Sequence, residues 1–208
     1  MKLTRRELLE RCAALGAVTL AASLPMSAVA AAWDDAANKR QVTPHCELGP
    51  FYKRLAPKTS TLRAAGDPGM PLEIAGVIYD TRSEIVPNAK VEVWQTDNAG
   101  VYDIEGYRYR ALIEPGAKGT YDLATVMPGH YPSRVCQHVH YLITAPGHKP
   151  LITQMYFATD PVFEGDPEKN FHRDPLISSR ELVRPVMIKG DPTQIIAAVN
   201  FDLVMETL

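Results

Sequence analysis

Short strand-forming segments separated by turns make up most of the sequence from about Leu72 onward, and this pattern most constrains the fold. The segments are rich in β-branched and aromatic residues, and Gly, Pro and Asn interrupt them. The expected strands are residues 72–80, 90–97, 138–146, 150–160, 181–189 and 194–206, with one more inside 120–132. Few helical patterns and 17 prolines accompany them. The pattern is typical of an antiparallel sandwich or barrel, and we predict an all-β, antiparallel β-sandwich with an irregular N-terminal segment.

The first thirty residues read as an export signal rather than as part of this fold. Arg5 and Arg6 precede an apolar stretch, which ends in the small-residue sequence Ala28-Val29-Ala30. The apolar stretch is short for a bilayer span. We therefore predict a twin-arginine signal peptide over residues 1–30 and a mature domain over 31–208. The mature protein would be periplasmic or secreted, with no stable membrane anchor after signal removal.

Charge and cysteine content exclude some partners and leave other questions open. The formal net charge is −2, so the chain presents no basic field for nucleic acid. Removal of residues 1–30 leaves Cys46 and Cys136, which could pair in an oxidising compartment, although spacing alone does not decide it. The oligomeric state is equally open, and a homo-oligomer is one possibility.

Two histidines one residue apart lie in the expected strand around residue 140. Side chains at positions i and i+2 of a strand share a face, so the imidazoles of His138 and His140 should lie side by side. Such a pair suits metal binding, but it could also be hydrogen-bonded in a half-buried sheet or simply exposed. Cys136 would share this face if the strand begins early enough, which makes it a possible further ligand.

Tyrosines in turns near these histidines could complete a metal site. Tyr102 follows the turn that ends one strand, and Tyr131 lies in a Pro-Gly turn seven residues before His138. A phenolate is a hard anionic donor that suits Fe(III). Composition does not single out these two among 9 tyrosines. An acid such as Asp97 or Asp103 could instead join the histidines around copper or zinc.

Four stretches in order resemble the intradiol ring-cleaving dioxygenases, the family that includes catechol, hydroxyquinol and protocatechuate dioxygenases. They are GPFY at 49–52, PLEIAGVIYDTRSEIVPNAKVEVWQTDNAGVYD at 71–103, PGHYPSRVCQHVHY at 128–141 and LITQMYFATDP at 151–161. Each alone would be weak, but their ordered combination is specific. It covers about residues 44–175, most of the mature chain.

The resemblance implies a non-haem Fe(III) site and assigns roles to particular residues. Its metal ligands fall on Tyr102, Tyr131, His138 and His140. Tyr131 is the ligand that leaves when substrate binds, and Gln154 is a glutamine near the substrate. Pro50 and Tyr52 would line the mouth of the pocket.

One expected residue is out of place. The family has an arginine three residues before the first histidine, where it stabilises charge on the substrate, but that position is Val135 and Arg134 lies one residue further away. A bulge could realign Arg134 for this role, or the role is lost.

The implied reaction joins a catechol-type diol and O2. The ring opens between the two oxygenated carbons, and both oxygen atoms end in a muconate-type diacid. Lys53 and Arg54 are candidates for reading a carboxylated substrate. The displaced arginine supports the alternative, an exported β-sandwich binding module with a vestigial or non-iron metal site.

Overall fold

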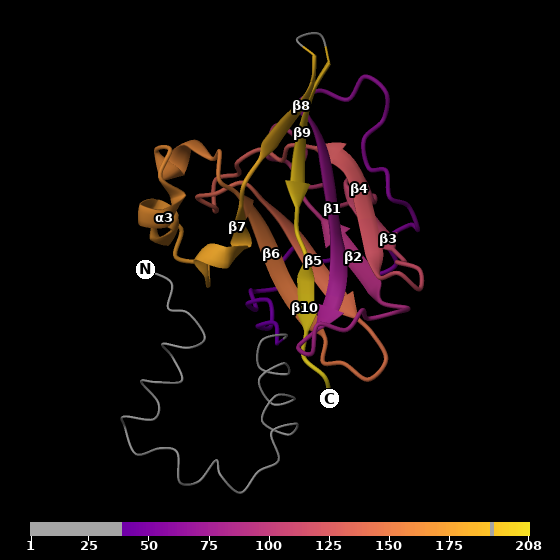
Figure 1. Ribbon diagram of the computed structural model, residues 1–208. Helices are drawn as coiled ribbons and strands as arrows, with labels where there is room; N and C mark the ends of the chain where they lie inside the picture. The colour runs from indigo at the N-terminus through magenta and orange to yellow at the C-terminus, as the bar shows by residue number, and fades with distance from the viewer. Residues whose placement is uncertain (1–38, 192–193) are drawn as a thin grey trace, which may run out of the picture. The chain divides into compact units, whose positions relative to one another are not determined.

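In the part of the chain that the structure describes, ten strands form two five-stranded sheets that share one hydrophobic core. The protein is described here by a computed structural model, which covers residues 39–191 and 194–208. The strands are β1 Pro71–Asp80, β2 Lys90–Trp94, β3 Arg110–Ile113, β4 Thr120–Val126, β5 His138–Thr144, β6 Leu151–Phe157, β7 Val183–Arg184, β8 Met187–Asp191, β9 Gln194–Asn200 and β10 Leu203–Met205 (Figure 1). This confirms the predicted all-β sandwich.

The directions of some strands differ from the expected purely antiparallel arrangement. One sheet has the order β10-β1-β9-β8, with β4 paired to β1, and the other has the order β3-β2-β5-β6-β7. Pairs joined by hairpins are antiparallel, as for β5 with β6. However, β1 runs parallel to β9 and β10, and β6 runs parallel to β7. The two strands of each parallel pair are far apart in the sequence, and this allows the parallel pairings, which a two-residue turn between the partners would not.

Alternation along β5 explains how one strand serves both the core and a site. Val139, Tyr141 and Ile143 are fully buried in the core that the two sheets share. Each such apolar side chain contributes roughly 1.5–3 kcal/mol relative to an exposed one. His138 and His140 point to the opposite face of the same strand, as predicted. They are also buried, because other segments cover that face.

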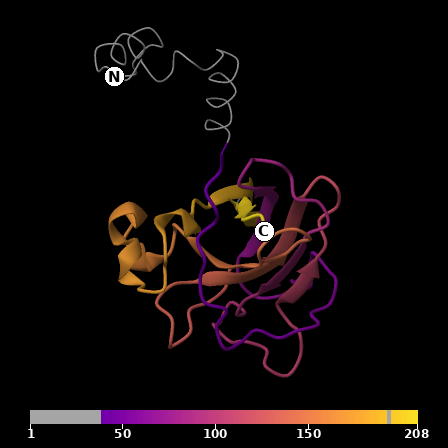
Figure 2. The same ribbon diagram turned by 90° about the horizontal axis from the view of Figure 1, so that it is seen from below.

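A run of short helices between β6 and β7 was not predicted from the sequence. It comprises η3 Pro161–Phe163, α3 Pro167–Asn170, η4 Phe171–Arg173 and η5 Arg180–Leu182. Carboxylates of Asp160 and Asp166 cap the first two helices. The helices lie to one side of the sandwich in both views (Figures 1 and 2). Helices this short carry no amphipathic period, which explains why the sequence did not reveal them.

The irregular segment before β1 is bound to both sheets. Backbone amides of Thr43 and Leu62 donate to one sheet, at Val204 and Ala124, and Cys46 donates to Ile152 of the other. The segment is thereby fixed in place without regular structure. Residues Arg40–Leu208 form one compact unit. The predicted export signal over residues 1–30 lies outside the described residues, and within them no helix has the length and apolar character to cross a membrane.

Candidate metal centre and substrate pocket

Strand register places four of the site's side chains in one row across the sheet. Across the second sheet, Arg110 of β3 pairs with Trp94 of β2, Trp94 with His140 of β5, and His140 with Gln154 of β6. Residues in such a row share a face of the sheet. The adjacent row pairs His138 with Tyr156. The sheet therefore fixes one wall of the site before any loop contributes.

Two loops complete the site by bringing both predicted tyrosines to the histidines. Tyr102 comes from the loop between β2 and β3, and Tyr131 from the loop between β4 and β5. The ring centroids are 5.5 Å apart for Tyr102 and Tyr131, 5.8 Å for Tyr131 and His138, and 4.9 Å for His138 and His140. The four proposed ligands are thus neighbours, although 38 residues separate the first from the last.

The histidines are neutral and available as ligands. His138 Nδ1 lies 2.8 Å from the Cys136 carbonyl oxygen, which can only accept, so this nitrogen carries the proton and leaves a lone pair on Nε2. Burial, and then the charge of Arg134, lowers the pKa of His138 to about 4. Burial, and then His138 and Arg134, lowers the pKa of His140 well below its usual value. A metal would therefore not have to displace a proton from either ring near neutral pH.

Two buried polar atoms without hydrogen-bond partners lie in this same cluster of tyrosines and histidines. The Tyr102 hydroxyl and His140 Nδ1 are buried without a hydrogen-bond partner among the described residues. A buried polar group left unpaired costs about 1–3 kcal/mol. Burial, and then the neighbouring Tyr131, raises the pKa of Tyr102, so only a strong adjacent cation would make it a phenolate. This donor set of two phenols and two neutral imidazoles fits Fe(III).

The competing ligand sets are not assembled. Asp97 accepts hydrogen bonds from the amides of Ala99 and Val101, and Asp103 accepts from three amides of its own turn. Cys136 is buried in the core, and both Cys46 and Cys136 are free thiols. Over residues 39–191 and 194–208, no group of three or more His, Cys, Asp or Glu side chains is arranged to hold a metal.

Arg134 enters the site despite its displaced position in the sequence. Its guanidinium donates to Gln154 Oε1 at 3.0 Å and to the Tyr156 hydroxyl at 2.9 Å, and it lies 3.3 Å from His138 Nε2. Asp174, from the helical run, lies 3.6 Å away and is 1% exposed. Val135, which occupies the family's arginine position, is exposed instead. The turn before β5 therefore accommodates the one additional residue between Arg134 and His138.

Gln154 and Tyr156 hold the arginine in a closed network. The Tyr156 hydroxyl donates to Gln154 Oε1 at 2.8 Å, and Gln154 Nε2 donates to the Glu47 carbonyl at 2.8 Å. All polar ends of Gln154 are thus engaged, which fixes the face it presents. Tyr156 was missed by sequence reasoning. Its position two residues after Gln154 on a strand was the available signal, because it places both on one face.

Aromatic rings support two of the proposed ligands from behind. The Phe51 ring stacks on Tyr102 with centroids 4.3 Å apart, and the Trp94 ring stacks on His140 at 4.8 Å with the planes within 6°. Gly49 also abuts His140, because a Cβ added there would lie 3.1 Å from its Cε1 atom. Phe51 and Trp94 were within the motifs read from the sequence, but nothing in the sequence assigned them to this task.

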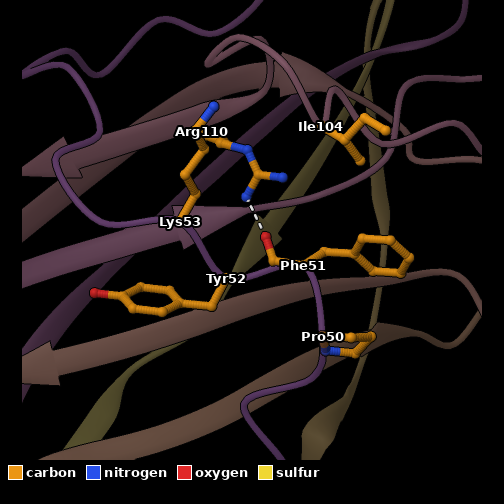
Figure 3. A pocket seen from close by; sticks show the side chains of 6 residues that line it. All are labelled: Pro50, Phe51, Tyr52, Lys53, Ile104 and Arg110. Atoms are coloured by element: carbon orange, nitrogen blue, oxygen red, sulfur yellow. Dashed lines mark hydrogen bonds between the residues drawn. The ribbon is translucent and has the colours of Figure 1, made fainter.

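A pocket opens beside this cluster at the predicted mouth residues (Figure 3). It has a volume of about 290 Å³ and is lined by Pro50, Phe51, Tyr52, Lys53, Ile104 and Arg110. Both predicted mouth residues, Pro50 and Tyr52, are among them. Phe51 joins the pocket to the metal-ligand cluster, since the same ring stacks on Tyr102.

Buried Arg110 forms one wall of this pocket. It donates to the Phe51 carbonyl at 2.6 Å (Figure 3). It also donates to the Asp103 carbonyl at 3.1 Å. The Lys53 ammonium is already bound by the carbonyls of Glu105 and Gly106. Arg54, the other predicted cation, is exposed and lines a neighbouring pocket instead.

Comparison with known proteins identifies relatives of this chain. A family model described as "Dioxygenase" matches residues 48–207. Hydroxyquinol 1,2-dioxygenase of Corynebacterium glutamicum is 31% identical over 76% of this chain and 62% of its own length. The protocatechuate 3,4-dioxygenase beta chain of Burkholderia cepacia is 32% identical over 64% of both chains. The chain thus spans less than two thirds of either relative.

Solved structures give the same result. The dioxygenase domain of a dioxygenase carbohydrate-binding protein fusion from Streptomyces sp. SirexAA-E superimposes with a TM-score of 0.68 and 27% identity. The match covers 81% of this chain and all of that one. With the family model spanning most of the sequence, the conclusion is direct: this chain belongs to the intradiol dioxygenase family.

Proposed function

We propose that this chain is a non-haem Fe(III) intradiol dioxygenase that uses O2 to open a catechol-type ring between its two oxygenated carbons, giving a muconate-type diacid. The observation that carries the proposal is the cluster of two tyrosine and two histidine rings beside a buried arginine. The family membership and the activities named for the relatives support the same reaction class.

Tyr102, Tyr131, His138 and His140 would hold the iron. Bound there, Fe(III) would supply a Lewis acid that favours deprotonated phenols and makes a chelated catechol reactive toward O2. The two tyrosines differ in burial in a way that suits different roles. Tyr102 is 7% exposed and stacked under Phe51, whereas Tyr131 is only half-buried. We assign the permanent position to Tyr102, and to Tyr131 the position that yields to substrate and accepts a proton from it.

Arg134 and Gln154 would face the substrate oxygens. The guanidinium is a fixed cation in a water-poor site, where it stabilises negative charge that develops on the substrate. Its position is set before substrate arrives by Gln154, Tyr156 and Asp174. Pro50 and Tyr52 would contact the part of the substrate ring that points to the pocket mouth.

A visible absorption spectrum of the purified protein tests the proposal. We expect a tyrosinate-to-Fe(III) band that shifts when catechol is added without oxygen, and ring-cleaved diacid carrying two labelled oxygens when ¹⁸O2 is admitted. Tyr102→Phe should weaken the band, whereas Tyr107→Phe should not, because the Tyr107 hydroxyl donates to the Arg54 carbonyl away from the cluster. A protein that stays colourless with added iron would refute the ligand assignment.

We also propose that residues 1–30 direct export by the twin-arginine route, on the sequence pattern described above. Cell fractionation of the wild-type chain and of the double variant Arg5→Lys, Arg6→Lys tests this. Retention of the variant in the cytoplasm is expected, and equal export of both chains would refute it.

A further inference from the structure

A buried carboxylate, Asp160, joins the two ends of the segment that carries Tyr131. We propose that Asp160 and His130 form a positioning pair, which holds Tyr131 at its place beside His138. The proposal rests on the proposed function, because it concerns how one of the metal ligands assigned above is held.

Asp160 contacts the two residues that immediately precede two of the proposed ligands in the sequence. His130, which precedes Tyr131, has its Nε2 atom 3.0 Å from Asp160 Oδ2 and 3.2 Å from Oδ1. A carboxylate accepts, so the imidazole nitrogen donates. Gln137, which precedes His138, donates its backbone amide to Asp160 Oδ2 at 2.8 Å. The Asp160 carboxylate thus bridges the two ends of the segment 130–137, and the Gln137 side chain adds a second tie, to the Pro128 carbonyl at 2.7 Å.

The anchor itself is rigid. Asp160 is 1% exposed and follows β6, the strand that also carries Gln154 and Tyr156. Its Oδ1 atom accepts from the amide of Val162 at 3.0 Å and so caps η3. A residue held by a strand on one side and a helix on the other can transmit its position to the loop it binds.

Tyr131 is held from before by this anchor and from after by a turn bond, in which its carbonyl accepts from the Arg134 amide at 3.0 Å. Within the described residues, ring contacts surround its side chain, but no hydrogen bond reaches its hydroxyl. The Gly129 amide and carbonyl are bonded to Asp97 and Thr96, so the segment is fixed again just before His130. The His130 side chain, 43% exposed, is therefore the last connection to a rigid element before Tyr131.

This arrangement has a consequence for substrate binding. If Tyr131 must yield its place to substrate, every interaction that keeps it in place opposes binding. Loss of the His130 hydrogen bond should raise the population of the displaced tyrosine. Catechol would then bind about fivefold more tightly, on the scale of one hydrogen bond. If the pair only supported the fold, its loss would weaken catechol binding or leave it unchanged.

The experiment compares His130→Ala with His130→Gln and with His148→Ala. The amide nitrogen of Gln can replace the Nε2 donor of His, so His130→Gln should restore the wild-type behaviour. His148 is a matched control, since it also bonds through its ring, to the Pro146 carbonyl in the turn between β5 and β6. For each full chain as purified we would measure iron content, amide hydrogen exchange of residues 128–137, the visible band and the anaerobic catechol Kd.

We expect His130→Ala to raise exchange in residues 128–137, to shift the visible band and to lower the catechol Kd, with both other variants like wild type. Unchanged exchange, or faster exchange with an unchanged band and Kd, would overturn the proposal. The proposed function fails separately, when the wild-type protein neither binds iron nor develops colour. In that case faster exchange would still show that the pair holds the loop, and its role toward a metal ligand would be refuted.

Discussion

Arg134 and Gln154 are joined side chain to side chain, with Nη2 of the arginine 3.0 Å from Oε1 of the glutamine, although 20 residues separate them. The bond ties the turn before β5 to the middle of β6. It also aims the guanidinium at the open side of the histidine pair, 3.3 Å from His138 Nε2. Arg134 therefore reaches the histidine pair although it lies one residue earlier in the chain than the family position, and this placement supports the role proposed for it.

Arg134→Gln should lower kcat for catechol about 100-fold, because removal of one fixed charge-stabilising donor costs roughly that much. Arg134→Lys should recover only part of the loss, since one ammonium nitrogen cannot replace both Nη1, which lies beside His138, and Nη2, which donates to Gln154 and Tyr156. Steady-state oxygen consumption measures both. Arg173→Gln is the control, because Arg173 pairs with Glu164 on the outer helical run. A kcat within twofold of wild type for Arg134→Gln would remove this residue from the catalytic machinery.

Tyr156→Phe should affect both activity and stability. The hydroxyl donates to Gln154 and accepts from Arg134, so its loss loosens the network without removing a charge. We expect kcat to fall about tenfold and the free energy of unfolding to fall by about 1 kcal/mol, the typical net value of a hydrogen bond. Urea unfolding and oxygen-uptake assays measure these changes. An unchanged kcat with reduced stability would restrict Tyr156 to a structural role.

The sequence was informative where local patterns decide the structure. The strand-forming run at residues 138–146 predicted a strand with both histidines on one face, and the structure has this strand as β5 at His138–Thr144. The two tyrosines could not be chosen from composition, because loops that cross between strands set their positions. Only the family resemblance selected them.

Other parts of the site depend on register and on long-range packing. The row from Arg110 to Gln154 exists because four strands pair in one register, and β3 was not predicted at all. Asp160 and Asp174 belong to or border the helical run, whose short helices have no sequence period. The placement of Arg134 follows from these two facts together, so counting residues from His138 could not establish it.

The metal-free protein should lose stability as the pH falls from about 6.5 toward 4. His138 has a pKa of about 4 when folded and near 6.5 when unfolded, so in this range the unfolded chain binds a proton that the folded chain excludes. Each pH unit then costs about 1.4 kcal/mol for one such group. Thermal unfolding at pH 7, 6, 5 and 4 measures the slope.

A control variant separates this effect from general acid unfolding. His138→Gln removes one of the two buried histidines whose pKa is lowered, so it should reduce the slope of the stability profile between pH 6.5 and 4 without abolishing it, because His140 remains. His172→Gln, at an exposed position, should leave the slope unchanged. Equal slopes for all three proteins would show that His138 is not protonated on unfolding in this range.

Gly49 should be required for the position of His140 as well as for the local backbone, and Gly147 allows the two to be separated. Both glycines have positive φ, +74° and +72°, so alanine at either site strains the backbone by a similar amount of about 1 kcal/mol. A Cβ at Gly49 would lie 3.1 Å from His140 Cε1, whereas one at Gly147 meets nothing within 4 Å. The His140 ring has no room to retreat, because Trp94 stacks on it.

We therefore expect both variants to lower the melting temperature, Gly49→Ala more than Gly147→Ala because of the contact with His140, and only Gly49→Ala to lower iron affinity, by about tenfold. Iron titration followed by the visible band, together with thermal unfolding, measures both quantities. Equal iron affinity in the two variants would show that the His140 ring can shift without loss of iron binding. The idea that Gly49 and Trp94 must hold His140 in place as a metal ligand would then be refuted.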